Sequence, residues 1–490
     1  MNLFRNWRFG YTKHVVRNVE ISAQSPETCL KVARAGLEYL HSNMEFIRDG
    51  KTYKFSEAMK KFTGSFETAV VKGTKPKPTS FEYEIPYKGK NLKGKEALAQ
   101  LDKWAKYGTI DPECRDAIAA VIKNEDWQDL SDSYFVLLGA GSAMGPLLVL
   151  LSLGANVIAV DLDRAPIWER LVGLAKNSPG TMIFPVKKPF KDIKSDKELY
   201  ENAGCNLFTQ APEIKNWLLG VESGKRLIIG GYAYLDAALF VKVAMAMDGI
   251  IEGVCEQRKD TALAFLCSPT DVFVTSAEAR KAMVKSLKDA PFWQKLVSSL
   301  SGGRFLVPNA RKECKSKDNK NTFNVVDGLV VAQGPNYALA KRLQHWRCML
   351  MWSQGHTVST NIAPSTATSS VVHNKQFAAA YGGMHHFKPM EIMYQETSNA
   401  VMGALLIHDV RNPKAYANPK TPLASPLQIH AGAPFHGGIW RMAYKMNSIG
   451  EMSAVIYYLN QYKVTLVGGL AGFVALVSFI ASKGAPHTWL

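Results

Sequence analysis

The sequence has few cysteines, and their spacing matches no common bridging or metal-binding pattern. Seven occur in 490 residues, and no two of them form a C-x-x-C pair. This scatter excludes a disulfide framework and argues against a zinc site built on paired cysteines. We therefore expect the folded part to face a reducing compartment, with the thiols acting as small apolar groups. The cysteines are Cys29, Cys114, Cys205, Cys255, Cys267, Cys314 and Cys348.

The motifs of metal-dependent and nucleic-acid-binding proteins are also missing. The histidines show no H-E-x-x-H or other ligand spacing, so we expect no bound metal. The net charge of +17 favours an anionic partner. However, no zinc finger, aromatic RNA-binding signature or basic helix accompanies the lysines, so we expect no nucleic acid among the partners. Six of the eleven histidines are candidate ligands: His356, His385, His386, His408, His430 and His436.

The N-terminus lacks the apolar segment of a signal peptide. Its first nineteen residues carry Arg5, Arg8, Lys13 and Arg17 but no acidic residue and no apolar run. Secretion is therefore not expected. The same composition leaves two alternatives open, an organellar presequence and a basic arm that rests on anionic lipid.

What is present is typical of a folded chain, because 47% of the residues are hydrophobic and 21% are charged. The length of 490 residues suits two or three domains. We predict an N-terminal, mostly helical region at 1–130, which includes a lysine-rich arm at 70–95. Residues 131–430 alternate apolar strands and helices and are predicted to form an α/β nucleotide-binding domain with insertions. Residues 431–490 are predicted to form a connector followed by a membrane anchor.

The anchor prediction depends on residues 464–482, which contain no charged residue and are bracketed by Lys463 and Lys483. As a helix they would span about 28 Å, close to the roughly 30 Å hydrocarbon core of a bilayer. We predict a single transmembrane helix with the folded domain facing the cytosol, and the endoplasmic reticulum is preferred over other organellar membranes. A buried core helix is the alternative. Glycines at 468, 469 and 472 would let two such helices pack as a homodimer.

A nucleotide-binding pattern begins at residue 134. Tyr134–Leu138 is predicted to be a buried strand, and after it come a glycine turn, a helix at 146–153 and a second strand that ends at Asp161. This order is typical of a βαβ dinucleotide-binding unit, in which the acid accepts hydrogen bonds from a ribose. We therefore predict a Rossmann-like, doubly wound parallel sheet that binds NAD or NADP. The predicted cofactor-binding residues are Gly139, Gly141, Ser142, Gly145, Asp161 and, for a 2′-phosphate, Arg164.

Two alternatives to a dinucleotide remain open for this unit. Met144 stands where the third glycine of G-x-G-x-x-G is expected, and Gly145 comes one residue later. An S-adenosylmethionine site also uses a glycine turn and an acid at the end of the second strand. A Rossmann-like unit without a ligand is the other alternative.

A second motif lies farther along the chain. Tyr337 and Lys341 are four residues apart in a predicted helix that runs to about Trp352, so both side chains lie on one helix face. The lysine charge can lower the tyrosine pKa, which assists proton transfer. Tyr416 and Lys420 have the same spacing, but Pro419 between them excludes a helix interior.

From the glycine turn to about Ser370 the chain resembles the short-chain dehydrogenase/reductase family. The Tyr-x-x-x-Lys helix is followed here, as in that family, by a strand and a loop, which in this chain includes Pro364 and Thr368. The resemblance implies a proton-transfer role for Tyr337 and Lys341, and a loop that closes over nicotinamide. The family's serine is replaced by Asn324, and Ser268 is predicted to substitute for it. The turn also has Ala143 in place of a glycine.

Together these features predict a membrane-anchored NAD(P)-dependent oxidoreductase that acts on a lipophilic carbonyl or alcohol. One alternative is an S-adenosylmethionine-dependent methyltransferase. The other is a non-catalytic membrane subunit that retains the fold for structure.

Overall fold

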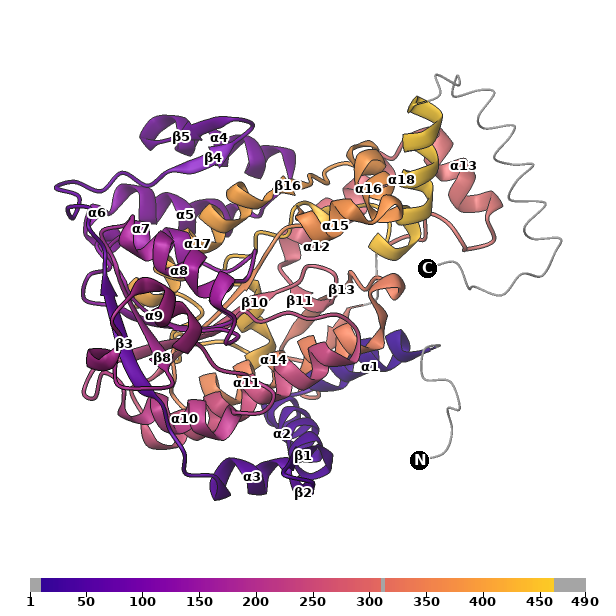
Figure 1. Cartoon of the computed structure of the whole chain (residues 1–490). Helices are drawn as coiled ribbons and strands as arrows, with labels where there is room; N and C mark the ends of the chain where they lie inside the picture. Colours follow the sequence, from indigo (N-terminus) through magenta and orange to yellow (C-terminus); the bar gives the residue numbers. More distant parts are fainter. Residues whose placement is uncertain (1–9, 310–312, 462–490) are drawn as a thin grey trace.

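The computed structural model describes residues 10–309 and 313–461. At its centre lies one seven-stranded sheet with the order β14-β10-β9-β6-β7-β8-β3 (Figure 1). Six of these strands are parallel, and β3 alone runs antiparallel, beside β8. The strands are β3 (Glu67–Lys72), β6 (Tyr134–Leu138), β7 (Asn156–Val160), β8 (Thr181–Val186), β9 (Leu227–Gly231), β10 (Ala262–Cys267) and β14 (Val358–Ile362).

The parallel strands follow the order found in dinucleotide-binding sheets. When β6 is counted as the first strand, the order across the sheet from β8 to β14 is 3-2-1-4-5-6. Strands β6 to β8 are added toward one edge of the sheet, and β9 to β14 are added toward the other. Ligands of such folds bind where this order reverses, between β6 and β9, at the carboxyl ends of the strands. The glycine turn follows β6 and therefore lies at this edge.

Helices cover both faces of the sheet because the central strands are apolar on both sides. Val136 and Leu138 of β6 contact one helical layer, whereas Phe135 and Leu137 contact the other. The first layer contains α1 (Tyr11–Ser22), α2 (Pro26–Asn43), α3 (Phe55–Lys61), α10 (Ala211–Gly220), α11 (Ala238–Gln257) and α14 (Gly334–Ser353). The second contains α4 (Gly94–Tyr107), α5 (Pro112–Lys123), α7 (Leu147–Ser152), α8 (Ala165–Lys176), α9 (Asp196–Asn202) and α17 (Gln395–Arg411).

A third group of elements packs beside the end of β10 around Phe273, Trp440 and Tyr444. Much of it comes from the segment between β10 and α14. Its elements are β11 (Val272–Thr275), α12 (Ala277–Lys288), α13 (Phe292–Leu300), β12 (Cys314–Lys315), β13 (Thr322–Asp327), α15 (Ser369–His373), α16 (Lys375–Gly383), η3 (Met384–His386), η5 (Ile439–Arg441) and α18 (Met446–Gln461).

Short elements complete the described chain. The lysine-rich arm contains the hairpin of β4 and β5, but Tyr83 and Ile85 at its base are buried. These elements are β1 (Glu45–Arg48), β2 (Lys51–Lys54), β4 (Ile85–Tyr87), β5 (Lys90–Leu92), α6 (Glu125–Gln128), η1 (Phe190–Asp192), η2 (Val331–Gln333), β15 (Thr366–Ala367), β16 (Met393–Tyr394) and η4 (Pro426–Ala431).

The structure corrects the predicted fold class in two respects. The sheet is mixed, not parallel throughout, because β3 from the N-terminal region pairs with β8 along its whole length. In addition, no helix within residues 10–309 and 313–461 is long and apolar enough to cross a membrane, so the structure does not support the predicted transmembrane helix. The segment predicted to form it, 464–482, lies outside the described residues.

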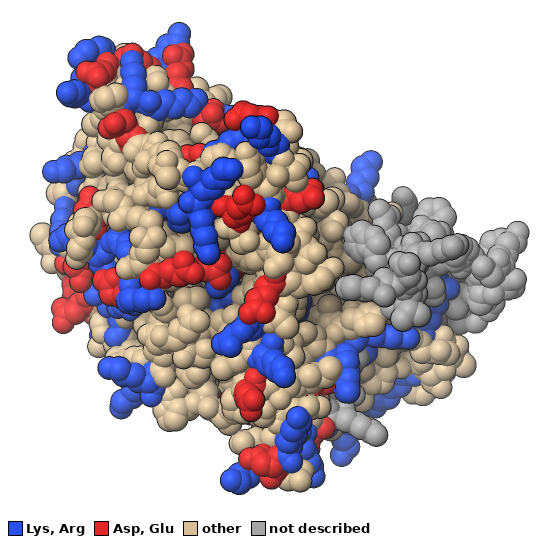
Figure 2. Space-filling view, turned by 90° about the horizontal axis from the view of Figure 1, so that it is seen from below, with Lys and Arg blue, Asp and Glu red and all other residues tan. Residues whose placement is uncertain are grey.

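Charged side chains are mixed on the face that Figure 2 shows. Lys and Arg side chains are interspersed with Asp and Glu over much of this face and do not form one basic stripe. Several pairs of opposite charge are in contact, for example Lys77 with Asp129 at 2.8 Å and Lys176 with Asp196 at 2.6 Å. Such exposed pairs contribute little to stability.

Candidate functional site

The glycine turn after β6 is shaped by a close approach of the chain. Gly139 has φ 95°, and a Cβ atom at this position would lie 2.5 Å from the backbone nitrogen of Ala233. The loop after β9 reaches this point because the backbone N–H groups of Tyr232 and Ala233 donate to the carbonyl oxygen of Leu138. A side chain at residue 139 would therefore push the two loops apart.

Asp161 at the end of β7 is bonded to the same turn. Its Oδ2 accepts a hydrogen bond from the Gly141 backbone N–H at 2.6 Å, and its Oδ1 accepts one from Leu162 at 2.8 Å. Arg170 donates to the Gly141 carbonyl oxygen at 3.2 Å. The structure thus brings Gly141 and Asp161 together. A carboxylate has about four acceptor sites, so two remain for a ligand hydroxyl.

Three other predicted cofactor residues follow β6 and β7, namely Ser142, Gly145 and Arg164. Gly145 donates its backbone N–H to the Ser142 carbonyl oxygen, which closes the turn at 3.0 Å. The helix after it, α7, has only six residues, Leu147–Ser152, and is shorter than predicted. Arg164 is exposed at the N-terminus of α8.

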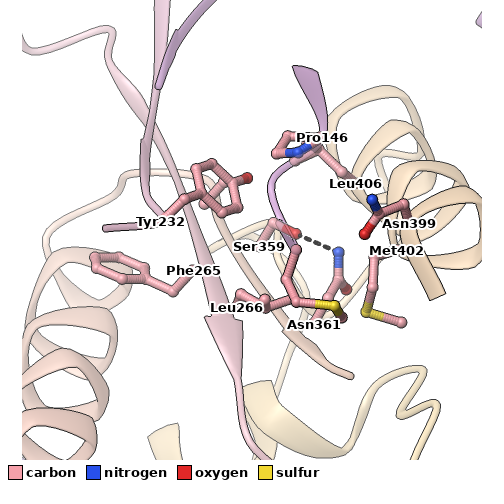
Figure 3. Close-up of a pocket in the computed structure, with 11 residues that line it drawn as sticks. Pro146, Tyr232, Phe265, Leu266, Ser359, Asn361, Asn399, Met402 and Leu406 are labelled. Carbon is pink, nitrogen blue, oxygen red and sulfur yellow. Dashed lines mark hydrogen bonds between the residues drawn. The ribbon is translucent and has the colours of Figure 1, made fainter. Parts of the chain in front are cut away.

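The opposite side of the turn is attached to α17. Gln395 and Asn399 both donate side-chain hydrogen bonds to the Ala143 carbonyl oxygen, at 2.9 and 3.0 Å. Beneath this contact Figure 3 shows a narrow cavity between the sheet and α17, where Ser359 and Asn361 are hydrogen bonded at 3.0 Å. Its volume of about 10 Å³ suits one water molecule and is too small for a nucleotide.

Ser268, Tyr337 and Lys341 come together at the same edge of the sheet. Ser268 directly follows β10, whereas Tyr337 and Lys341 lie in the first turns of α14. The Lys341 Nζ is 5.8 Å from the centre of the Tyr337 ring. The Ser268 hydroxyl is hydrogen bonded to Thr270 at 2.6 Å, and it lies close enough to the Tyr337 phenol to lower the pKa of that phenol. The segment inserted between β10 and α14 therefore does not separate the three residues.

Burial changes the acidity of this group. It raises the pKa of Tyr337, and the nearby Ser268 hydroxyl opposes that change only in part. Burial also lowers the pKa of Lys341, whose Nζ donates to the Leu266 carbonyl oxygen at 2.8 Å. The phenol is consequently protonated at neutral pH and can donate a proton. The nearby lysine charge would stabilise the phenolate that forms.

Three aromatic residues that the sequence analysis missed surround Tyr337. The ring centres of Tyr234 and Phe240 lie 6.2 and 5.4 Å from that of Tyr337. Tyr381 of α16 lies close enough to raise the Tyr337 pKa through its charge, and the nearby Ser365 hydroxyl lowers the pKa of Tyr381. Tyr234 could have been found from its place just after the fourth strand of the pattern. No feature of the sequence identifies Tyr381.

Pro364 and Thr368 belong to the loop after β14. Because β10 and β14 are neighbouring parallel strands, this loop lies at the edge that carries Ser268. Pro364 is buried, and its carbonyl oxygen accepts a hydrogen bond from the Thr366 hydroxyl at 2.9 Å. Thr366 is also hydrogen bonded to Ser398 of α17, at 2.7 Å. Thr368 precedes the first residue of α15.

Comparison with known proteins adds no family to this geometry. A scan against models of protein families found no match, and a search of curated proteins found no similar sequence. The function must therefore be argued from the arrangement of the residues themselves.

Proposed function

We propose that the protein is an NAD(P)-dependent oxidoreductase that interconverts a carbonyl and an alcohol. The observation that carries this proposal is the convergence of Ser268, Tyr337 and Lys341 at the carboxyl edge of a sheet with the dinucleotide-binding strand order. Proton donors and a glycine turn at one sheet edge are what hydride transfer to a carbonyl requires.

The residues of the turn fit a dinucleotide. Gly139 and Gly141 leave the backbone bare, and a Cβ at residue 141 would lie 2.8 Å from Arg170 and 3.0 Å from Asp161. Asp161 retains acceptor capacity for a ribose diol. The bound nicotinamide would supply a hydride acceptor or donor. Arg164 is the cation available for a 2′-phosphate, so Arg164→Ala should weaken NADPH binding and leave NADH binding unchanged if the protein uses NADP.

In the direction of carbonyl reduction, the chain's own residues would orient the substrate and supply a proton. Ser268 would donate a hydrogen bond to the carbonyl oxygen, and Tyr337 would transfer its phenolic proton to that oxygen. Lys341 would stabilise the resulting phenolate through its charge. Such proton transfer by a positioned side chain contributes about 10²- to 10⁴-fold to a rate.

The surroundings of Tyr337 support a substrate with an apolar body. Tyr234 and Leu239, in and after the loop that follows β9, are 51% and 47% exposed. Tyr234 and the buried Phe240 form an aromatic wall beside the phenol, and Leu239 adds an exposed aliphatic side chain next to Phe240 in the sequence. A long aliphatic or polycyclic carbonyl should therefore be turned over faster than a small, fully hydrated one.

Calorimetric titration of the full chain with NAD, NADH, NADP, NADPH and S-adenosylmethionine tests the proposal. We expect binding of one nicotinamide form, lost in Gly141→Trp but retained in Gly220→Trp, where an added Cβ meets no atom within 4 Å. Selective binding of S-adenosylmethionine would replace the proposal with methyl transfer. If the folded protein binds none of the five ligands, the proposal that this site is enzymatic is wrong.

A further inference from the structure

Three buried side chains that the proposed reaction does not use meet behind the proton-transfer residues. Cys267 is the last residue of β10, His345 lies in α14, and His430 lies in η4. Their ligand atoms are all within 4.8 Å of one another. The three residues are only 1%, 1% and 3% exposed. Three distant parts of the sequence thus place a sulfur and two imidazoles at one point.

The two histidines have unused nitrogen atoms. The Nε2 atoms of His345 and His430 are buried and have no hydrogen-bond partner among the described residues. The Cys267 sulfur is 3.9 Å from Nδ1 of His430, which is a weak contact. Buried polar atoms are nearly always paired, because an unpaired one loses its hydrogen bonds to water without replacement. Two orphaned nitrogens beside one thiol therefore indicate a missing partner.

A neutral imidazole offers one nitrogen lone pair for coordination, and a cysteine coordinates as the thiolate. A cation would therefore have to displace the thiol proton, as metal ions do when they bind cysteine.

A cation bound by His345 would lie close to the positive charge of Arg342. Its Nη2 lies 2.7 Å from Asp271 Oδ1 and 2.6 Å from Nδ1 of His345. Because arginine only donates, Nδ1 is the acceptor and the His345 proton is on Nε2. Coordination through Nε2 therefore requires the proton to move to Nδ1, and the Arg342 contact with Nδ1 must give way to its bond with Asp271 Oδ1. The ion then displaces one proton, that of the Cys267 thiol, so the charge beside Arg342 and Lys341 rises by one.

We propose that Cys267, His345 and His430 bind one divalent transition-metal ion of the zinc class. Sulfur and imidazole ligands select zinc-like ions over magnesium or calcium. Asp271 Oδ2 has no hydrogen-bond partner among the described residues and lies 3.9 Å from Nδ1 of His345, so it is the acceptor available to an Nδ1–H group when Nε2 binds the ion. The ion would join β10, α14 and η4.

The location gives the ion a positioning role. Cys267 directly precedes Ser268, and His345 lies one helical turn after Lys341. An ion held by both would fix the end of β10 relative to α14, and so the distance between Ser268 and Tyr337. It would not contact the substrate, because its ligands are buried behind these residues.

Cobalt(II) titration of the metal-depleted full chain tests the site, since a thiolate bound to cobalt absorbs in the near ultraviolet. We expect one cobalt ion per chain with this thiolate band, and its displacement by zinc. Cys267→Ser should abolish the band, and His430→Gln should weaken binding. Cys255→Ser, which removes a buried thiol outside the cluster, should change neither.

Two results would overturn the proposal. One is a folded, reduced wild-type chain that gives no thiolate band and no rise in thermal midpoint with zinc. The other is a band that persists in Cys267→Ser, which would assign the metal to another cysteine. If Cys267→Ser fails to fold, the wild-type titration alone decides. Dinucleotide binding is measured separately, so failure of the metal site and failure of the proposed function are distinguishable.

Discussion

The buried carboxylate of Asp248 should be one of the largest single contributors to stability. It lies on α11 and accepts hydrogen bonds from Nε and Nη2 of Arg347 on α14, both at 2.7 Å. His41 of α2 is also 2.7 Å away. The Asp248 and Arg347 side chains are 1% and 4% exposed. Three helices of one layer are thus joined at one carboxylate, and one of them carries Tyr337.

Asp248→Asn should lower the free energy of unfolding by about 3 kcal/mol. Removing one partner of a buried ion pair typically costs about 3–5 kcal/mol, because the other charge stays buried without compensation. The lower end applies here because Arg347 keeps a second partner, Glu252, at 2.8 Å, which is partly exposed. Replacing both members, as in Asp248→Leu with Arg347→Met, should recover part of the loss.

The same pair predicts that the free energy of unfolding depends on pH. Burial by itself raises the pKa of Asp248, but the charges and hydrogen bonds of Arg347 and His41 outweigh it and lower the pKa from 3.8 to about 2. A folded-state pKa below the unfolded value means that the stabilisation is complete above about pH 4 and is lost as the pH falls through about 2. The difference in free energy of unfolding between wild type and Asp248→Asn should therefore become smaller in acid.

Urea unfolding followed by tryptophan fluorescence at pH 7 and at pH 3 measures both effects. The matched control is Asp289→Asn, which removes an exposed carboxylate paired with Lys285 and should cost less than about 0.5 kcal/mol. A loss below about 1 kcal/mol for Asp248→Asn at pH 7 would refute the reasoning. A gap that widens in acid would refute the sign of the linkage.

Three further predictions concern single positions. Tyr337→Phe should reduce carbonyl turnover about 10²- to 10⁴-fold and leave dinucleotide affinity unchanged; weakened binding with normal turnover would contradict its role as proton donor. Gly139→Ala should lower the thermal midpoint and weaken dinucleotide binding, whereas Gly89→Ala, with the same sign of φ but no neighbour within 4 Å, should lower the midpoint less and leave binding intact. If the two substitutions had equal effects, backbone strain alone would explain the lower thermal midpoint. Trp168→Ala should cost about 3–5 kcal/mol in urea unfolding, because Trp168 is fully buried and stacked on Phe184 at 4.8 Å; a cost near 1 kcal/mol would mean that the core closes around the gap.

The sequence predicted local elements well where one periodic pattern dominates. The strand expected at Tyr134–Leu138 is β6, with the same bounds, and the strand expected to end at Asp161 is β7, which ends one residue earlier. The predicted helix from Tyr337 to about Trp352 is confirmed by α14. The mostly helical region predicted at 1–130 gives no such bounds, and residues 94–123 within it form two helices, α4 and α5. Gly108, with φ 94°, ends the first, and Pro112 begins the second.

Long-range pairings could not be predicted in the same way. β3 joins the sheet through β8, more than a hundred residues later, and no local pattern specifies such a partner. The cluster of Cys267, His345 and His430 escaped the motif search for the same reason, because its members share no spacing. Fixed spacings find ligands on one turn or helix, but they do not find ligands that separate elements bring together.

α14 also shows where hydrophobic periodicity fails. The helix buries Lys341, Arg342, His345 and Arg347, so it has no clear apolar face. Burying cations is costly unless they are paired, and Asp271 and Asp248 pair with only the two arginines. A helix needed only for packing would carry apolar residues here. The cost of the unpaired Lys341 and of the orphaned His345 nitrogen is best explained if these groups act on a substrate and a metal ion.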